Sequence, residues 1–305
     1  MTSASSLALV VACMERRYPP STAEDWDAVG LVCGDPQAPV RRILWAVDPV
    51  EAVVDEAIDM GADLVITHHP LFLSGVHAVA ATTAKGRVVH RLISAGIALY
   101  CAHTNADVAD PGVSDALAAT VGLTRTRPVV PAEPVRDGLA DPPGQPDRGG
   151  LADSPGQPED PEGIATGLGR IGELEEPTTL ADFAARVAGA LPPTQHGVRV
   201  AGDPGGRVHR VAVCGGSGDS LLAIATDMGA DVLVTADLKH HRALEHLEEG
   251  GCAIIDVAHW ASEWPWLEQA AQLLEADLDR EGTTVVSVVS AQPTDPWSMT
   301  LRSEP

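Results

Sequence analysis

The sequence predicts an α/β fold with two similar three-layer lobes, each built on a largely parallel sheet. Short apolar runs alternate with segments of helical periodicity in both halves of the chain, which is typical of β-α-β units with right-handed crossovers. The pentapeptide Asp-Met-Gly-Ala-Asp occurs at 59–63 and again at 227–231. Each copy precedes an apolar run that ends in a threonine, Thr67 or Thr235. A His-x-x-x-carboxylate pattern follows the next run in each half. Two matches in the same order predict an old duplication of one α/β unit.

We expect the first lobe over residues 1–130. Helix 7–17 has apolar residues at helical spacing and precedes two prolines, which cannot continue a helix. The segment 23–34 contains a tryptophan and two glycines, and it predicts a tight, packed turn that enters a strand. The other expected elements are strands 42–47, 64–67 and 97–102 and helices 50–60, 85–95 and 114–121.

Residues 131–163 differ sharply in composition from the rest of the chain. GLADPPGQPD at 138–147 is followed by GLADSPGQPE at 150–159. This tandem duplication is rich in Pro, Gly and Asp and has almost no core-forming residues. It therefore predicts a disordered insert without a catalytic role rather than a folded repeat.

We expect the second lobe over residues 164–290, followed by a poorly ordered tail at 291–305. Thr179 and Asp182 predict a capping box before helix 183–191. The turn Gly-Gly-Ser-Gly at 215–218 opens a helix; we favour close packing of that helix against the sheet over a phosphate cradle made by backbone N–H groups. The other expected elements are strands 208–214, 231–235, 253–257 and 283–289 and helices 218–228, 241–248 and 264–276.

Charge and composition limit the partners. The formal net charge is −23, from 43 acidic and 20 basic residues, which opposes nucleic acid and anionic membranes as general partners because both attract a positive surface. Solubility alone explains such a charge, which is also compatible with cation binding. The apolar run 7–13 is too short to span a bilayer, and we expect no signal peptide. The five cysteines are scattered and form no CxxC, so we expect a reducing, cytoplasmic location.

Two adjacent histidines, His68 and His69, end the predicted strand 64–67, and Pro70 prevents the ladder from continuing. In open α/β sheets this carboxyl edge is where ligands bind. Adjacent strand residues point to opposite faces, but a turn at Pro70 lets both rings reach one crevice, each facing a different metal ion. The alternative is a pair of polar turn residues with their rings in solvent.

Side chains of metal-ligating type follow the predicted strands in both lobes. They are His68, His69, His103 and Asp107 in the first lobe and Asp237, His241, His259 and Glu263 in the second. Imidazoles and carboxylates suit zinc, iron or manganese. Two divalent ions about 3.5–4 Å apart would need roughly this many ligands and would activate a bridging water, while the remaining groups orient the ligands. The alternative is that several of these residues are capping or core residues.

Six segments together resemble one known family. They are AEDWDAVGLVCG at 23–34, ITHHPLF at 66–72, AHTNAD at 102–107, VAVCGGSG at 211–218, VTADLKHH at 234–241 and VAHWASE at 257–263. The chain resembles the dinuclear-metal toroid family of GTP cyclohydrolase 1 type 2 homologues, also called NGG-interacting-factor-like proteins. The resemblance covers nearly the whole chain except the insert and the tail.

The resemblance implies a two-metal site in the cleft between the lobes and a ring-shaped homohexamer. It also implies a ligand set, with Glu263 as the bridge between the ions: His68, His69, Asp107, His259 and Glu263. Lys85 and Lys239, the two lysines of the chain, fall where the family pattern has lysine. Ala236 departs from the family's usual glycine, which alters a turn but not the ligand set. Some relatives carry a folded domain between the lobes, whereas this chain has the low-complexity insert.

The residues predict a metal site, and the resemblance to the family implies a metal-dependent hydrolase that acts on a nucleotide-like or phosphate-containing small molecule. Two divalent metal ions would polarise the substrate and generate hydroxide, and His103 or His241 would shuttle protons. The family name suggests GTP ring opening, but no motif in the sequence indicates guanine recognition. The alternative is a non-enzymatic metal-binding adaptor or metal-handling scaffold, whose metal site would be closed by protein ligands.

Overall fold

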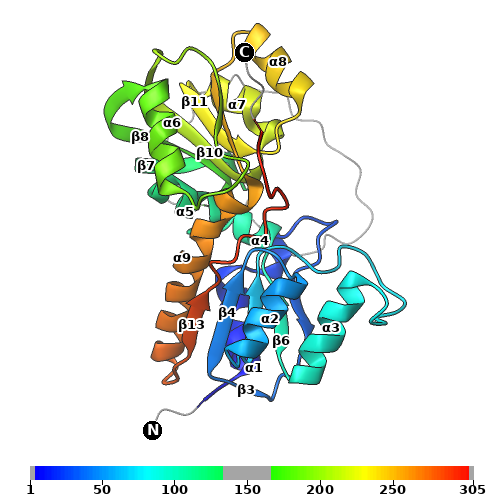
Figure 1. Cartoon of the computed structure of the whole chain (residues 1–305). Helices are drawn as coiled ribbons and strands as arrows, with labels where there is room; N and C mark the ends of the chain where they lie inside the picture. Colours follow the sequence, from blue (N-terminus) through cyan, green and yellow to red (C-terminus); the bar gives the residue numbers. More distant parts are fainter. Residues whose placement is uncertain (1–3, 133–165, 302–305) are drawn as a thin grey trace, which may run out of the picture.

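The computed structural model describes residues 4–132 and 166–301, which form two α/β lobes, one above the other in Figure 1. Apart from its first two residues, the insert expected at 131–163 lies outside these ranges. No helix within the described residues is long and apolar enough to cross a membrane.

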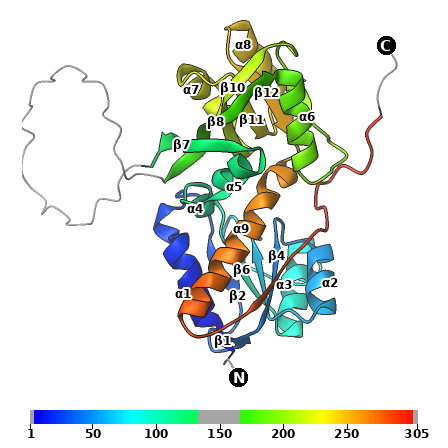
Figure 2. The ribbon, with the colours of Figure 1, turned by 90° about the vertical axis from the view of Figure 1, so that its left-hand side faces the viewer.

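The first lobe is a five-stranded sheet with helices on both faces. Its elements are β1 (Ser5–Ser6), α1 (Leu7–Arg17), η1 (Pro20–Thr22), β2 (Gly30–Cys33), β3 (Pro39–Val40), β4 (Arg42–Ala46), α2 (Glu51–Asp59), β5 (Leu64–Thr67), α3 (Ala84–Ala95), β6 (Ala98–Cys101), α4 (Thr104–Asp107) and β13 (Val286–Val289). The strand order is β13-β4-β5-β6-β2, and the pairings are parallel except for β2 with β6. Helices α2 and α3 cover one face, and α1 covers the other, which gives the expected three layers (Figure 2).

The second lobe has a six-stranded mixed sheet. Its elements are α5 (Val113–Thr120), β7 (Leu123–Pro131), β8 (Gly167–Thr179), α6 (Leu180–Ala190), β9 (Arg199–Ala201), β10 (Arg207–Ser217), η2 (Asp219–Leu221), α7 (Leu222–Asp227), β11 (Val232–Ala236), α8 (His240–Glu248) and β12 (Ala253–Val257). The order is β7-β8-β10-β11-β12-β9, with α5 and α6 on one face and α7 and α8 on the other.

The expectation of a largely parallel sheet is correct for the first lobe and wrong for the second. In the second sheet only β10–β11 and β11–β12 are parallel. The three antiparallel pairings all involve β7, β8 or β9. These strands lack the apolar runs that mark buried parallel strands: β7 and β9 carry exposed residues, and β8 carries glycines and the buried Arg170.

Helix α9 (His259–Arg280) joins the two lobes. It starts beside β12 in the second lobe and runs down along α1 in the first (Figure 2). Its Trp266 and Leu274 belong to one core cluster that includes strand residues from both sheets. The helix begins five residues earlier than the predicted start at 264 and continues through Pro265, which lies inside it. Pro265 lacks the N–H that would bond the carbonyl four residues earlier, which is why a proline usually marks a helix boundary in a sequence.

Helix α9 returns the chain to the first lobe, so the expected lobe boundaries shift. The prediction that 283–289 completes the second lobe is wrong, since β13 pairs in parallel with β4. Conversely, β7 begins within the range 1–130 but pairs with β8 of the second sheet. Residues 291–301, expected to be poorly ordered, make hydrogen bonds to both lobes.

The repeated pentapeptide has the same local structure in each lobe. Asp63 Oδ2 accepts the backbone N–H of Arg42 at 3.0 Å, and Asp231 Oδ2 accepts that of Arg210 at 2.8 Å. In each copy the same oxygen also accepts the N–H of the preceding residue. The shared contacts, together with the parallel triplets β4-β5-β6 and β10-β11-β12, support the predicted duplication.

Candidate metal centre

The residues predicted as metal ligands come together where the lobes meet. His68 and His69 follow β5, and Asp107 is the last residue of α4, directly after β6. His259 and Glu263 lie on successive turns at the start of α9. Strand ends of both sheets therefore supply side chains to a single cluster, as expected for the carboxyl edge of parallel strands.

His68 is fully buried and has a defined tautomer. Its Nδ1 lies 3.0 Å from the carbonyl oxygen of Ala102; because a carbonyl only accepts, Nδ1 carries the hydrogen. In the neutral ring Nε2 therefore presents a lone pair, 3.5 Å from Glu263 Oε1 and 3.6 Å from Asp107 Oδ1; burial lowers the pKa of His68, but these carboxylates outweigh it and raise the pKa. Among the described residues this nitrogen has no hydrogen-bond partner. A buried acceptor that faces two carboxylates is unfavourable unless a cation lies between them.

His69 and His259 are held in the same way from opposite lobes. His69 Nδ1 donates to Asp48 Oδ1 at 2.7 Å, and His259 Nδ1 donates to Asp237 Oδ2 at 2.7 Å. Their Nε2 atoms lie 3.2 Å apart. They are also 3.1 Å and 2.9 Å, respectively, from the two oxygens of Glu263. Both rings therefore direct their second nitrogen at the same buried carboxylate.

The charges of the cluster are strongly coupled. Burial opposes ionisation of Glu263, but His69, His259 and His68 hold its pKa well below the usual value. Burial also lowers the pKa of His69, yet Glu263 and Asp48 outweigh it and raise the pKa to about 11. The same balance raises the pKa of His259 to about 9. Burial raises the pKa of Asp107 to about 6, which His68 opposes. The cluster therefore favours added positive charge between the rings, from protons or from metal ions.

The donor set and the space around it fit divalent metal ions. Two groups have potential ligand atoms within 4.8 Å of one another: His68 with His69 and His103, and His69 with His259 and Glu263. A Cβ at Gly216, where φ is +65°, would lie 2.6 Å from Glu263 Oε1. The glycine thus leaves the space that the Glu263 carboxylate occupies. Neutral imidazole and carboxylate are suitable ligands for zinc, iron or manganese.

His103 borders the cluster and is oriented by Asp27. Its Nδ1 donates to Asp27 Oδ1 at 2.9 Å, and Asp27 Oδ2 accepts the backbone N–H of Thr104 at 3.0 Å. The His103 ring centroid lies 5.2 Å from that of His68. Burial, together with the nearby His68, lowers the pKa of His103 despite Asp27. The ring is therefore neutral at pH 7, with its Nε2 available as an acceptor.

Asp27 and Asp48 are not among the site residues predicted from the sequence. Both accept the Nδ1 hydrogen of a cluster histidine, as Asp237 does. Such outer carboxylates fix the tautomer and orientation of a metal-binding ring. A signal was present in both cases, since Asp27 lies in the motif 23–34 and Asp48 directly follows the predicted strand 42–47.

The structure does not bring His241 into the cluster. It is exposed on α8, and the ring contact that it makes within the described part of the chain is with His240, at 5.2 Å between centroids. Lys239 is the exposed N-cap of the same helix. Lys85, in contrast, lines a cavity of about 530 Å³ that also contacts His69 and Asp48.

The glycine turn 215–218 supports packing rather than a phosphate cradle. A Cβ at Gly218 would lie 2.5 Å from the Thr235 hydroxyl, and one at Gly215 would lie 2.6 Å from a Val113 methyl. The helix that follows, α7, is a single short segment after a 3₁₀ turn. The turn thus allows close approach of neighbouring elements and of Glu263.

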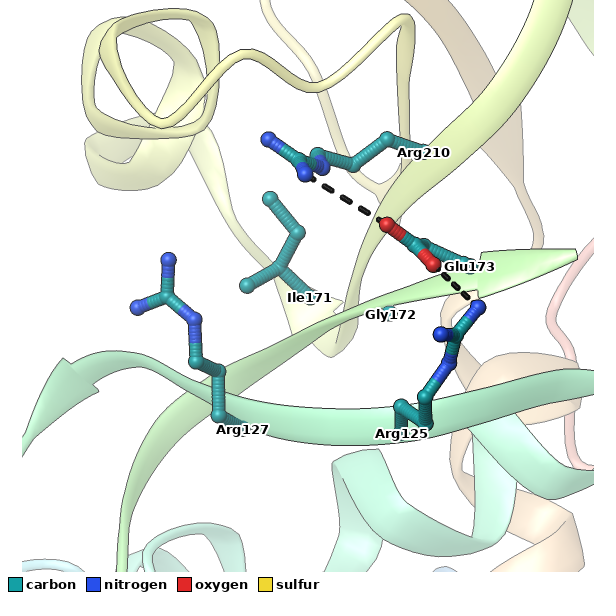
Figure 3. A pocket seen from close by; sticks show the side chains of 6 residues that line it. All are labelled: Arg125, Arg127, Ile171, Gly172, Glu173 and Arg210. Carbon is teal, nitrogen blue, oxygen red and sulfur yellow. Dashed lines mark hydrogen bonds and ion pairs between the residues drawn. The ribbon is translucent and has the colours of Figure 1, made fainter. Parts of the chain in front are cut away.

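A second polar cavity, of about 180 Å³, lies on the second sheet and contains none of the predicted site residues (Figure 3). Glu173 forms ion pairs with Arg125 and Arg210 there, while Arg127 stands apart on β7. Its lining residues are Arg125, Arg127, Ile171, Gly172, Glu173 and Arg210. These ion pairs are largely exposed, so they contribute little to stability.

Comparison with known families agrees with this geometry. The profile of the Duf34/NIF3 (NGG1p interacting factor 3) family matches residues 6–296. The chain belongs to the Duf34/NIF3 family. The resemblance seen in the sequence is thereby confirmed. The matched range includes all six sequence segments, between residues 23 and 263, that carry the resemblance.

Duf34/NIF3 relatives match over nearly their whole length. A "GTP cyclohydrolase 1 type 2 homolog" from Streptomyces coelicolor is 48% identical over 299 residues, covering 98% of this chain and 96% of that protein. A protein of the same name from Mycobacterium tuberculosis is 40% identical over 371 aligned positions, covering 96% and 97%. The crystal structure of a Bacillus cereus protein related to NIF3 has a TM-score of 0.82 at 29% identity, covering 97% and 99%. The fold described above is therefore that of NIF3 structures.

Proposed function

We propose that this chain binds two divalent metal ions at the lobe junction and hydrolyses a nucleotide-like or phosphate-containing small molecule. One observation carries the proposal: the Nε2 atoms of His68, His69 and His259 converge on the buried Glu263. Each of these rings has its other nitrogen committed to a carbonyl or carboxylate. Such fixed rings are suited to holding metal ions.

The residues would divide between two ions. His68 Nε2 lies 3.6 Å from Asp107 Oδ1, whereas the Nε2 atoms of His69 and His259 lie 3.2 Å apart. Glu263 is the natural bridge, since each of its oxygens lies near a different subset of the rings. Bound divalent ions would polarise a phosphoryl or carbonyl oxygen and supply a nucleophile at neutral pH.

His103 is the proposed proton acceptor. Asp27 holds the hydrogen on Nδ1, so a proton from the reaction would be taken at Nε2. The partial exposure of the His69, His259 and Asp107 side chains, at 22%, 31% and 20%, supports access from solvent. The nucleotide-like substrate class rests on the naming of the relatives.

A metal-handling scaffold or adaptor is the second candidate. The complete burial of His68 and the 3% exposure of Glu263 favour it, because closed sites are typical of structural metals. For either function we propose a ring-shaped homohexamer, by analogy with the family, which light scattering after size exclusion would test. The five cysteines are free, which supports the proposed cytoplasmic location.

The deciding experiment is elemental analysis of untagged protein beside a His68→Ala/Glu263→Ala variant. We expect about two transition-metal ions per chain in the wild type, by analogy with two-metal sites, and loss of both in the variant. A panel of nucleotides and phosphoesters with added manganese or zinc then separates the candidates. Turnover that disappears in the variant supports the hydrolase, and bound metal without turnover supports the scaffold. A metal-free wild type after reconstitution would exclude both.

A further inference from the structure

The segment after β13 crosses from the first lobe to the second. We call residues 290–301 the C-terminal strap; Figure 1 shows it in dark red, running up from β13. Its first residue, Ser290, is 2% exposed, and its backbone N–H donates to the Trp45 carbonyl at 2.8 Å. Trp264 Nε1 donates to the Ser290 carbonyl at 2.8 Å. The strap therefore has a firm attachment in the first lobe.

The other end of the strap is attached to the second lobe. The hydroxyl of Thr300 donates to the backbone carbonyl of Gln195, which lies between α6 and β9. With both ends held, the residues between them bridge the two lobes, and Thr294 among them reaches Asp48, which orients His69 of the cluster. The strap thus has a defined path past the site.

Between its two ends, the strap contacts Asp48, the carboxylate that orients His69 of the cluster. The Thr294 hydroxyl donates to Asp48 Oδ2. The other oxygen of this carboxylate, Oδ1, accepts the Nδ1 hydrogen of His69 at 2.7 Å. His69 Nε2 in turn lies 3.1 Å from Glu263 Oε2. An unbroken line of polar contacts therefore leads from the strap to the buried centre of the cluster.

This series of polar contacts gives the Thr294 hydroxyl a specific role. A carboxylate that accepts a ring N–H fixes the tautomer and direction of that ring. It does so only if its own plane is fixed, and the Thr294 hydroxyl occupies the oxygen that His69 does not use. Without that hydroxyl, Asp48 could rotate or bind water, and His69 would lose its set direction.

We propose that Thr294 is a positioning residue that sets the orientation of His69 for metal binding by fixing the Asp48 carboxylate. The inference rests on the proposed metal site. A purely structural strap would join the lobes and affect stability only. A positioning strap affects metal affinity through one hydroxyl group.

Three variants separate these roles. Thr294→Val removes the hydroxyl at nearly constant shape, and Thr294→Ser restores a hydroxyl at the same place. Thr300→Val makes the same change elsewhere on the strap, at a bond that does not involve Asp48. Affinity for Mn²⁺ is measured by calorimetry on metal-free protein, with the melting temperature of each metal-free variant as the measure of folding.

We expect Thr294→Val to weaken Mn²⁺ binding about tenfold, the lower end of the range for outer partners of a metal ligand. Thr294→Ser and Thr300→Val should stay within about twofold of the wild type, since both keep a hydroxyl on Asp48. Unchanged binding in Thr294→Val overturns the proposal, as does an equal loss in Thr300→Val.

A metal-free measurement keeps this test separate from the proposed function. In apo protein labelled with ¹⁵N-histidine, the wild type should show a protected Nδ1–H on His69, and Thr294→Val should show faster exchange of that hydrogen. Thr294→Ser should again resemble the wild type. If the wild type binds no Mn²⁺, the proposed function fails while this readout still decides the role of Thr294. An identical His69 signal in wild type and Thr294→Val overturns the positioning role.

Discussion

His69 and His259, contributed by different lobes, face each other with their Nε2 atoms 3.2 Å apart. Each ring donates its Nδ1 hydrogen to an aspartate, so neither neutral ring can donate a hydrogen bond to the other. Two facing lone pairs repel unless positive charge lies nearby, and Glu263 beside them adds to that demand. The relationship explains why the cluster fits metal ions.

Glu263→Gln should remove the shared carboxylate charge of the cluster. We expect metal affinity to fall by at least about 100-fold, because changing an outer partner of a metal ligand already costs 10–100-fold. Glu268→Gln is the matched control, since it makes the same change at an exposed position on the same helix. Elemental analysis and Mn²⁺ titration check both. Retention of two ions by Glu263→Gln would rule out a bridging role.

Gly216→Ala should distort the site, because its Cβ would lie 2.6 Å from Glu263 Oε1. Gly229→Ala is the control: its φ of +74° is similar, but the nearest atom is Arg210 Nη1 at 3.5 Å. Both variants should lose about 1–2 kcal/mol in urea unfolding from the left-handed backbone. Metal should be lost only from Gly216→Ala. Equal metal content in the two variants would contradict the described contact.

Metal removal should lower the melting temperature. The proposed ligands come from both lobes, so bound ions stabilise only the folded arrangement. At a free-ion concentration about 100 times Kd, binding contributes about 2.7 kcal/mol. Calorimetry before and after chelation measures this, and the His68→Ala/Glu263→Ala variant should not respond to the chelator. The same melting temperature after proven metal loss would argue against a site at the lobe junction.

The pentapeptide aspartates should contribute equally to the two lobes. Asp63→Ala and Asp231→Ala each remove a carboxylate that accepts two backbone N–H groups, and we expect each to cost about 1–3 kcal/mol. Asp59→Ala, at the first position of the same pentapeptide, changes an exposed side chain and should cost less than about 0.5 kcal/mol. Urea unfolding of the three variants provides the test. A large effect in one lobe alone would weigh against equivalent repeats.

The tyrosines should resist ionisation. The chain has two, Tyr18 and Tyr100, both buried. Burial raises the pKa of Tyr18 to about 12, against the usual value of about 10. A raised folded pKa stabilises the fold below pH 10, and this contribution is lost as the pH rises from about 10 through 12. Absorbance titration should therefore show no tyrosinate in folded protein at pH 10; a signal there, with native circular dichroism, would disprove it.

The cluster could be predicted from sequence because its members follow apolar runs at matching places in both halves. The start of α9 could not, since a proline usually ends or kinks a helix; Pro265 therefore marked a boundary in the sequence, whereas the structure holds it inside α9. As a result, the sequence shows that His259 and Glu263 are four positions apart, but not that they lie on successive turns of one helix.

Other features depend on distant contacts. Asp48 acquires its role only when β4 lies beside β5, which brings it to His69. Thr294 lies in the segment 291–305, which the sequence predicts to be a poorly ordered tail. Its hydrogen bond to Asp48 spans 246 positions of the chain. The mixed second sheet was missed because its edge strands β7 and β9 carry exposed residues and its inner strand β8 carries glycines and Arg170, so none of the three forms an apolar run.

Helix α9 has a consequence for how the protein moves. Its N-terminal turns carry two cluster residues, and its remainder is buried against strands of both sheets in one continuous core. Rotating one lobe away from the other would separate side chains that pack together in that core, so hinge opening would require partial unfolding. We therefore expect the hydrogen-bonded amides of α9, from Ser262 onward, to exchange as slowly as those of the central strands, and the cluster to keep one geometry throughout any reaction cycle.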